Sequence, residues 1–275
     1  MVPFSVTISV YKNDKPEYFK IAIDSILEQS LPPNEIILTV DGPVSDVLNS
    51  IIERYEYEKE NLKVVRLPKN VGIGIAHKIG VECCSNSLIA IMDSDDIAVS
   101  DRFEMQLRYF EKHKDVDVVG GYISEFIDNT ENIVGIRDVP LTDIAIKRFL
   151  KKRCPMNHVT VMFKRDVLLK TGNYENWDSN EDYHLWCKML LNKCIFGNIP
   201  TVLVNVRIDK NMYKRRGGWK YFRTVAKLQK FMFRTKIINL REYIVNISIR
   251  FIVQMLITNT MRGFVYRRLF RKLTD

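Results

Sequence analysis

The stretch Leu88-Ile-Ala-Ile-Met-Asp-Ser-Asp-Asp96 decides the fold of this chain. Its first five residues form an uninterrupted apolar run, which is typical of a strand buried on both faces of a sheet. Three carboxylates follow within the next four residues. Strands of this kind occur in parallel sheets, and such sheets bind ligands beyond the carboxyl ends of their strands. The stretch therefore predicts a parallel α/β sheet with an acidic site at the end of this strand.

The chain before residue 88 repeats the same pattern. Short apolar strands are expected at residues 6–10, 35–40, 62–67 and 88–92, and helices at 16–30, 47–57 and 73–83. Strands that alternate with helices predict a sheet covered by helices on both faces. Polar residues follow three of these strands, at 11–14, at Asp41 and at 93–96. We therefore expect these polar residues to meet at one edge of the sheet.

The second half of the chain has a mixed pattern. Strands are expected at residues 116–122, 159–163 and 201–208, and a helix at 182–191. The sequence shows no internal repeat and no linker before residue 205 that is long enough to separate two independent domains. One α/β domain is therefore expected to extend past residue 200.

The three carboxylates Asp93, Asp95 and Asp96 repel one another, and a folded site holds them together most easily with a compensating cation. A hard divalent ion with oxygen ligands is the natural partner, and the D-x-D spacing allows Asp93 and Asp95 to converge on it. The alternative is an exposed acidic turn ahead of a helix that begins near Ser100 and Asp101. The sequence pattern alone leaves both interpretations open.

The charge of the chain is distributed unevenly. The net charge is +9, yet residues 201–275 carry 18 Lys and Arg against Asp209, Glu242 and Asp275. The preceding 200 residues are therefore mildly acidic. This division indicates an anionic partner at the C-terminal end, either a nucleic acid or a membrane surface.

The C-terminal segment has the pattern of an amphipathic helix. Asn246, Arg250 and Gln254 are spaced by four and share one helical face, while the other faces are apolar. Cations surround the apolar residues that follow, from Arg262 to Lys272. Apolar faces with flanking cations predict a segment that lies in a membrane interface, although packing on the body of the protein is the alternative. The longest apolar stretch, about 15 residues with Arg250 inside it, is short for a membrane span.

The N-terminus and the cysteines bear on the compartment. The first residues have neither a basic region nor a sustained apolar core, so they indicate a strand and not a secretory signal. The five cysteines form no C-x-x-C pair, which argues against a disulfide framework or a cysteine zinc site and fits a reducing cytosol.

A series of motifs, in order along residues 3–222, resembles the family 2 glycosyltransferases with the GT-A fold, and is similar to bacterial enzymes that build O-antigen and exopolysaccharide repeat units. The motifs are Phe4-Ser-Val-Thr-Ile-Ser-Val-Tyr11, Ser25-Ile-Leu-Glu-Gln-Ser30, Val40-Asp-Gly42, Asn70-Val-Gly-Ile-Gly74, Ile91-Met-Asp-Ser-Asp-Asp96, Cys154-Pro-Met-Asn-His158, Val161-Met-Phe163, Glu181-Asp-Tyr-His-Leu-Trp186 and Asn211-Met-Tyr-Lys-Arg-Arg-Gly-Gly218. The chain departs from the family after Gly74, where Ala-Arg-Asn or Ala-Leu-Asn is usual and Ala76-His77-Lys78 stands here.

The resemblance implies a role for each matching position. Ser9, Tyr11 and Asp41 are expected to hold the uracil and ribose of a UDP-sugar. Asp93 is expected near the ribose and diphosphate, and Asp95, together with Asp93, to bind Mn²⁺ or Mg²⁺. Asp182 is the expected general base, with Glu181 beside it.

Three further side chains are expected to bind substrate. His158 lies in one of the matching motifs. Arg215 and Arg216 lie in a loop that ends in Gly217-Gly218. We expect this loop to close over the donor diphosphate, where the two guanidinium groups would offset the charge.

The expected function is an inverting, metal-dependent transfer of a hexose (glucose, galactose or an N-acetyl form) from a UDP-sugar to a polyprenyl-diphosphate-linked saccharide. Residues 1–222 are expected to form the catalytic domain, with 1–100 binding the nucleotide-sugar and 101–222 forming the acceptor side and the lid. Residues 223–275 are expected to associate with a membrane. The expected location is the cytoplasmic face of a bacterial inner membrane, as a peripheral protein without a nucleic-acid partner.

Other enzyme and binding classes fit the residues less well. A nucleotidyltransferase would need a glycine-rich phosphate loop after the first strand, where this chain has Tyr11-Lys-Asn-Asp14. A dinucleotide dehydrogenase fails because Gly72-x-Gly74 follows no first strand and the third glycine position is His77. A nucleic-acid-binding protein would use the basic C-terminal segment but would leave the acidic clusters unexplained.

Overall fold

A nine-stranded sheet forms the centre of the protein, whose computed structural model describes residues 2–177, 180–209 and 217–258. The strands lie in the order β3-β2-β1-β4-β8-β6-β9-β5, with β7 paired to β6. Their bounds are β1 (Phe4–Val10), β2 (Glu35–Val40), β3 (Leu62–Arg66), β4 (Leu88–Asp93), β5 (Ile97–Ala98), β6 (Val118–Phe126), β7 (Ile133–Arg137), β8 (Met162–Lys164) and β9 (Phe196–Arg207). The first four strands are mutually parallel, as predicted, and β8 joins β4 in the antiparallel direction.

Helices cover both faces of the sheet, which confirms the predicted α/β class. The helices are α1 (Pro16–Leu27), α2 (Asp46–Glu58), α3 (Ile73–Cys83), α4 (Arg102–Lys112), α5 (Asp143–Leu150), α6 (Arg165–Lys170), α7 (Glu181–Leu191), α9 (Gly218–Arg234) and α10 (Leu240–Phe251), with short helical turns η1 (His158–Thr160) and η2 (Ile252–Leu256). Apolar side chains of α1, α2 and α4 form one core, and those of α3, α5, α7 and α9 form the other.

The register of the parallel strands explains why polar residues meet at one edge. Ser9 on β1 lies opposite Asp93 on β4 and opposite Thr39 on β2. The carboxyl ends of these three strands therefore lie side by side. The sequence prediction of a shared polar edge is confirmed.

Strand β9 differs most from its prediction, because it begins at Phe196 and not near residue 201. Glycine and proline usually interrupt strands, so Gly197 and Pro200 led the sequence pattern to predict a later start. The Tyr109 ring explains the glycine, since a Cβ at Gly197 would lie 2.5 Å from the tyrosine Oη. On the neighbouring strand β6, the pairing with β9 is irregular around Gly121 and Tyr122. These residues lie across from the part of β9 that contains Pro200.

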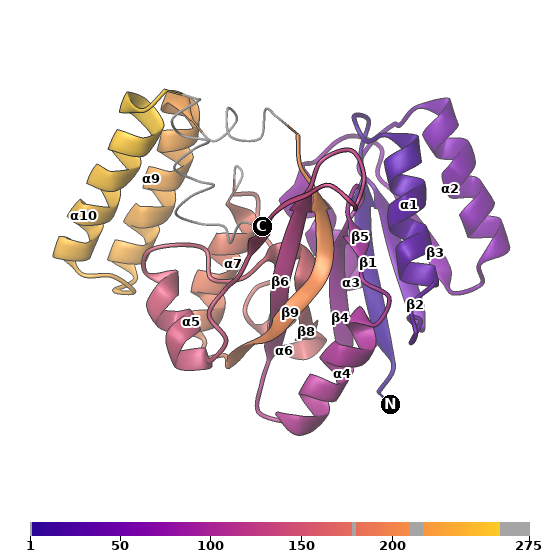
Figure 1. The fold of residues 1–275 in the computed structure, drawn as a ribbon, viewed down its shortest axis with the longest axis horizontal. Coiled ribbons are helices and arrows are strands. Elements are labelled where there is room, and N and C mark those ends of the chain that lie inside the picture. Colours follow the sequence, from indigo (N-terminus) through magenta and orange to yellow (C-terminus); the bar gives the residue numbers. More distant parts are fainter. Residues whose placement is uncertain (1, 178–179, 210–216, 259–275) are drawn as a thin grey trace.

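The C-terminal helices α9 and α10 pack together at the end of the molecule away from α1 and α2 (Figure 1). Leu228 and Met232 of α9 are buried in the second core. The expected boundary between residues 222 and 223 therefore falls inside a helix that belongs to the body. Within the described ranges, no helix has the length and apolarity needed to cross a membrane.

Candidate active site

A cavity of about 440 Å³ opens where strands β1, β2 and β4 end. Seven of the ten side chains predicted for the site line it: Ser9, Tyr11, Asp41, Asp93, Asp95, His158 and Glu181. They come from segments up to 172 residues apart, which the sheet brings to one place. Of the other three, Asp182 lies beside Glu181 without lining the cavity, and Arg215 and Arg216 fall outside the described residues.

The three acids at the end of β4 have different surroundings. Asp95 is exposed, and Asp93 is partly buried, so both can reach a ligand in the cavity. Burial, together with the neighbouring Asp95 and Glu181, raises the pKa of Asp93 above its ordinary value. Asp96 is buried and accepts a hydrogen bond from the backbone N–H of Arg207 at 2.8 Å. Two acids therefore face the site, and the third holds the turn in place.

Two arginines that the sequence analysis missed stabilise this acidic turn. Arg207 donates to the carbonyl oxygens of Asp95 and Asp128, and its guanidinium lies 3.9 Å from the centre of the Tyr18 ring. Arg102 is fully buried behind β4 and donates to the carbonyl oxygen of Ile91 at 2.8 Å. Burial lowers the pKa of Arg102 to about 9, while Asp93 and Asp96 oppose that shift. A cation behind the strand therefore offsets part of the carboxylate charge.

Asp41 organises the loop that forms the opposite wall. Its carboxylate accepts hydrogen bonds from the side chain of Asn70 and from the backbone N–H groups of Val71 and Gly72, at 2.6 to 3.0 Å. The turn at Gly42 has a φ of +85°, and a Cβ there would lie 2.5 Å from the backbone nitrogen of Asn70. Glycine therefore allows the two loops to touch, and Asp41 fixes the cavity wall.

Asp14 is a further cavity residue that the prediction left out. Its Oδ2 atom accepts a hydrogen bond from the Tyr11 backbone at 3.1 Å and another from the Ser94 hydroxyl at 2.8 Å. Burial raises its pKa, which the bond from Ser94 partly opposes. Asp14 thus ties the loop after β1 to the acidic turn after β4. The only sequence signal was its place in the polar stretch after the first strand.

Glu181 and Asp182 begin helix α7, and their side chains have different contacts. Glu181 lines the cavity, where burial and the adjacent Asp182 raise its pKa to about 7. Asp182 accepts a hydrogen bond from the Tyr183 backbone at 2.6 Å and a longer one from Cys154 Sγ at 3.5 Å. A carboxylate with a pKa near neutrality is suited to proton transfer, so the pair fits acid–base chemistry.

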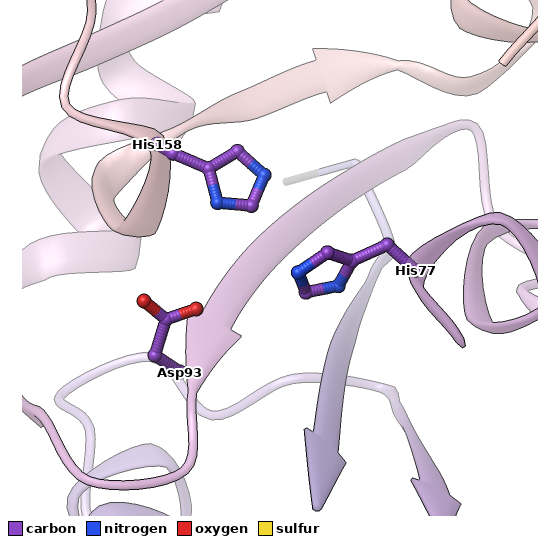
Figure 2. A group of neighbouring side chains, drawn as sticks. All are labelled: His77, Asp93 and His158. Atoms are coloured by element: carbon purple, nitrogen blue, oxygen red, sulfur yellow. The ribbon is translucent and has the colours of Figure 1, made fainter. Parts of the chain in front are cut away.

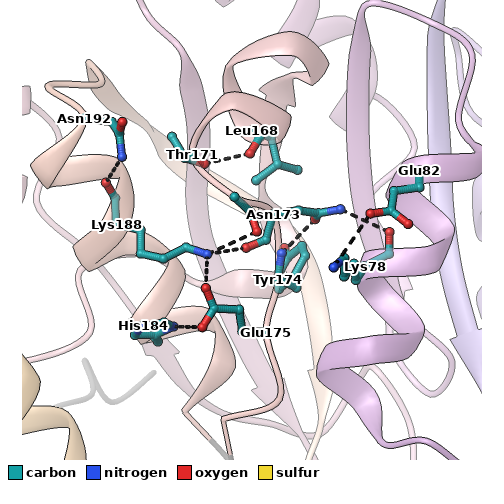
Figure 3. Close-up of polar contacts among 11 residues, drawn as sticks. Lys78, Glu82, Leu168, Thr171, Asn173, Tyr174, Glu175, His184, Lys188 and Asn192 are labelled. Atoms are coloured by element: carbon teal, nitrogen blue, oxygen red, sulfur yellow. Dashed lines mark hydrogen bonds and ion pairs between the residues drawn. The ribbon is translucent and has the colours of Figure 1, made fainter.

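The segment before α7 is anchored by Lys188. Its ammonium donates to the carbonyl oxygens of Gly172 and Asn173 and pairs with Glu175 at 2.7 Å (Figure 3). This anchoring places the buried Tyr174, whose hydroxyl lies 2.8 Å from His158 Nε2. Burial lowers the pKa of His158 to about 4, so the ring is neutral at neutral pH.

Comparison with known proteins assigns this chain to a family. Residues 5–172 match glycosyl transferase family 2. The UDP-Gal:alpha-D-GlcNAc-diphosphoundecaprenol beta-1,3-galactosyltransferase of Escherichia coli is 36% identical over 269 residues, which cover 98% of this chain and 97% of that protein. The amylovoran biosynthesis glycosyltransferase AmsE of Erwinia amylovora is 35% identical over 225 residues, covering 82% of this chain and 84% of that protein.

A solved structure confirms the expected GT-A fold. The S. aureus TarS fragment 1–349, crystallised with UDP-GlcNAc, is 17% identical, with a TM-score of 0.66 over 91% of this chain and 72% of that one. At this identity the likeness concerns the fold alone. The family match decides between the enzyme and binding classes that the sequence pattern left open. This chain belongs to glycosyl transferase family 2 and is a glycosyltransferase.

Proposed function

We propose that this chain is an inverting, metal-dependent transferase that moves a hexose from a UDP-sugar to a saccharide carried on a polyprenyl diphosphate. The observation that carries the proposal is the shared cavity of the Asp93–Asp95 turn and Glu181, which faces Ser9, Tyr11 and the loop held by Asp41. Likeness over nearly the whole chain to a galactosyltransferase named for a UDP-Gal donor and a diphosphoundecaprenol acceptor supports the substrate classes.

Asp95 and Asp93 would hold Mn²⁺ or Mg²⁺, because paired carboxylates at a strand end offer the oxygen ligands that hard ions prefer. The raised pKa of Asp93 fits this role, since the repulsion that raises it is what a bound cation relieves. When bound, the ion offsets the charge that develops on the leaving diphosphate. Arg215 and Arg216 would add cationic donors to the same diphosphate.

Asp182 would take the proton from the acceptor hydroxyl, with Glu181 beside it in the cavity wall. The pair begins α7, whereas the acidic turn follows β4, so base and leaving group approach the sugar from separate elements. A base on the face opposite the leaving group favours a single displacement, which inverts the anomeric carbon. An α-linked donor would then give a β-linked product.

The test measures UDP release from UDP-galactose, UDP-glucose and their N-acetyl forms with N-acetylglucosaminyl-diphosphoundecaprenol as acceptor. Asp95→Ala should lower kcat/KM by about 10²–10³-fold, as loss of a transition-state electrostatic partner does. Asp101→Ala is the matched control, because this nearby exposed acid makes no capping bond at α4. Full activity with a chelator, or in Asp95→Ala, would contradict the metal role.

Membrane association is the second part of the proposal, at the cytoplasmic face of a bacterial inner membrane. Helix α10 presents its polar side to the protein: Asn246 donates to the Lys151 carbonyl oxygen and to Gln229, and Arg250 donates to the Lys152 carbonyl oxygen. Lys151 is the C-cap residue of α5 and Lys152 follows it, so both carbonyls lie at the C-terminal end of that helix. The apolar side of α10 and η2 therefore faces outward, with these side chains exposed: Leu240, Ile244, Val245, Ile249, Phe251, Ile252, Met255 and Leu256.

Cations and an aromatic residue accompany this apolar surface. Helix α9, which packs against α10, exposes Lys220, Arg223, Lys230 and Arg234, charges that anionic lipid attracts. Trp219 is 56% exposed and joins Phe222 and Phe251 in a row of ring contacts. Tryptophan at such a place is typical of a protein surface that meets lipid headgroups.

Flotation with phosphatidylglycerol vesicles tests the membrane part. The Ile244→Asp, Ile249→Asp double variant should bind at least about tenfold more weakly, because burying one isoleucine contributes about 1.5–3 kcal/mol. Ile144→Asp is the control, since Ile144 is also an exposed isoleucine but lies on α5. Equal binding of the double variant and the wild type would refute the lipid-facing role of α10.

A further inference from the structure

Two histidines and an aspartate gather in the wall of the cavity. His77 comes from α3, Asp93 ends β4 and His158 begins η1 (Figure 2). One ligand atom of each lies within 4.8 Å of the other two, and all three side chains line the cavity. In Figure 2 the two rings and the carboxylate point toward a common space.

Both imidazoles stand in the cavity wall, where His77 is buried and His158 is partly buried. A histidine binds a metal ion through the lone pair of one ring nitrogen, so each ring offers one possible ligand atom. His158 also has an oxygen partner for one ring nitrogen, since its Nε2 meets the Tyr174 hydroxyl at 2.8 Å, and such outer partners orient metal-bound histidines.

His77 is the second, independent indication of a ligand. Its side chain is 1% exposed, and its Nδ1 atom has no hydrogen-bond partner within the described part of the chain. The ring packs against the rings of His158 and Tyr174, which do not satisfy a polar nitrogen. A buried polar side chain without a hydrogen bond destabilises the fold unless a ligand engages it.

We propose that His77, Asp93 and His158 form a site for a nitrogen-preferring divalent transition metal of the Zn²⁺ class, with an open coordination position facing the cavity. Two imidazoles and one carboxylate, with a free position, are the ligands of an open zinc site. Mg²⁺ prefers oxygen ligands, so this site differs in selectivity from the Asp95 side of the acidic turn. Asp93 lies between the two and belongs to both.

The experiment titrates the metal-free full chain with Co²⁺, a spectroscopic substitute for Zn²⁺, in excess Mg²⁺. The wild type should develop a visible d–d band that saturates at one equivalent and is bleached by Zn²⁺. The mixture contains neither donor nor acceptor, so the result does not depend on the transferase proposal. A thiolate-to-cobalt band in the near ultraviolet would instead assign the ion to cysteine and overturn the proposal.

Variants identify the ligands. His77→Leu should weaken Co²⁺ binding by more than about tenfold, because even outer partners of metal ligands contribute 10–100-fold. Leucine keeps an apolar side chain at this buried position, and thermal unfolding checks that the variant folds. Tyr174→Phe should weaken binding about 10–100-fold, and His113→Ala, which removes an exposed imidazole at the end of α4, should change nothing. An unchanged band in folded His77→Leu, or no band in the wild type, would overturn the site.

Discussion

The edge of the sheet where Asp93 and Glu181 lie differs from helix α10 in what it buries. The edge of the sheet buries charged groups, and α10 exposes apolar ones. The edge removes charge from water: Asp93 and Glu181 are partly or largely buried among other acids. Helix α10 does the reverse, because Asn246 is buried while Ile244 and Ile249 are exposed. Both arrangements destabilise the isolated fold, since buried carboxylates and exposed apolar surface each oppose folding.

The difference shows what each region would bind. Desolvated carboxylates are stabilised by a cation or a proton, so the edge of the sheet is suited to a metal ion and to proton transfer. Exposed apolar side chains are stabilised by apolar surroundings, so α10 is suited to lipid. Function is expected where local rules are broken, and these two regions break them with opposite chemistry.

The largest effect is expected at the first turn of α7. Asp182→Ala should lower kcat by about 10²–10⁴-fold, as loss of a general base does, and Glu181→Gln should lower it less. Asp166→Ala is the matched control, because Asp166 is an exposed acid in the first turn of α6. UDP release under saturating substrates measures the three rates. A greater loss in Glu181→Gln than in Asp182→Ala would transfer the base role to the residue that lines the cavity.

Two single substitutions, one on each side of α10, test the other region. Asn246→Leu should reduce the free energy of unfolding by about 1–3 kcal/mol, because it leaves Gln229 and the Lys151 carbonyl without their donor. Ile249→Asn, on the exposed side of the same helix, should change it by less than about 0.5 kcal/mol. Urea unfolding measures both. Similar losses in the two variants would mean that the polar side of α10 does not hold it to the body.

The smallest effect concerns the pH dependence of stability without metal. The pKa of Glu181 is raised from 4.5 to about 7 in the folded protein. Between pH 4.5 and 7 the folded state therefore binds more protons at Glu181 than the unfolded state does. The stability that this protonation contributes is complete below pH 4.5 and is lost as the pH rises through 7. Glu181→Gln should remove this loss, so its melting temperature should exceed that of the wild type at pH 8 but not at pH 4. If the melting temperatures of the two proteins differed by the same amount at every pH, Glu181 would not titrate as described.

Much of the fold was predictable because it depends on local pattern. The four apolar runs that alternate with helical spacing predicted the parallel half of the sheet, and all four strands were found. The start of β9 was missed because Gly197 and Pro200 resemble a turn. Pairing with β6 extends the strand to Phe196, and the Tyr109 ring explains the glycine. Arg102 was missed for a similar reason, since nothing in the sequence distinguishes a buried arginine from an exposed first residue of a helix.

The sequence by itself determined the family, the acidic turn at the end of a strand and the spacing of Asn246, Arg250 and Gln254 on one helical face. Only the tertiary structure decided which acid of each motif faces the cavity, and it alone brought His77 next to His158, 81 residues away. It also decided that the polar side of α10 turns inward. Periodicity fixes which residues share a face, but the partner decides which face is buried, and here the partner is the carbonyl end of α5.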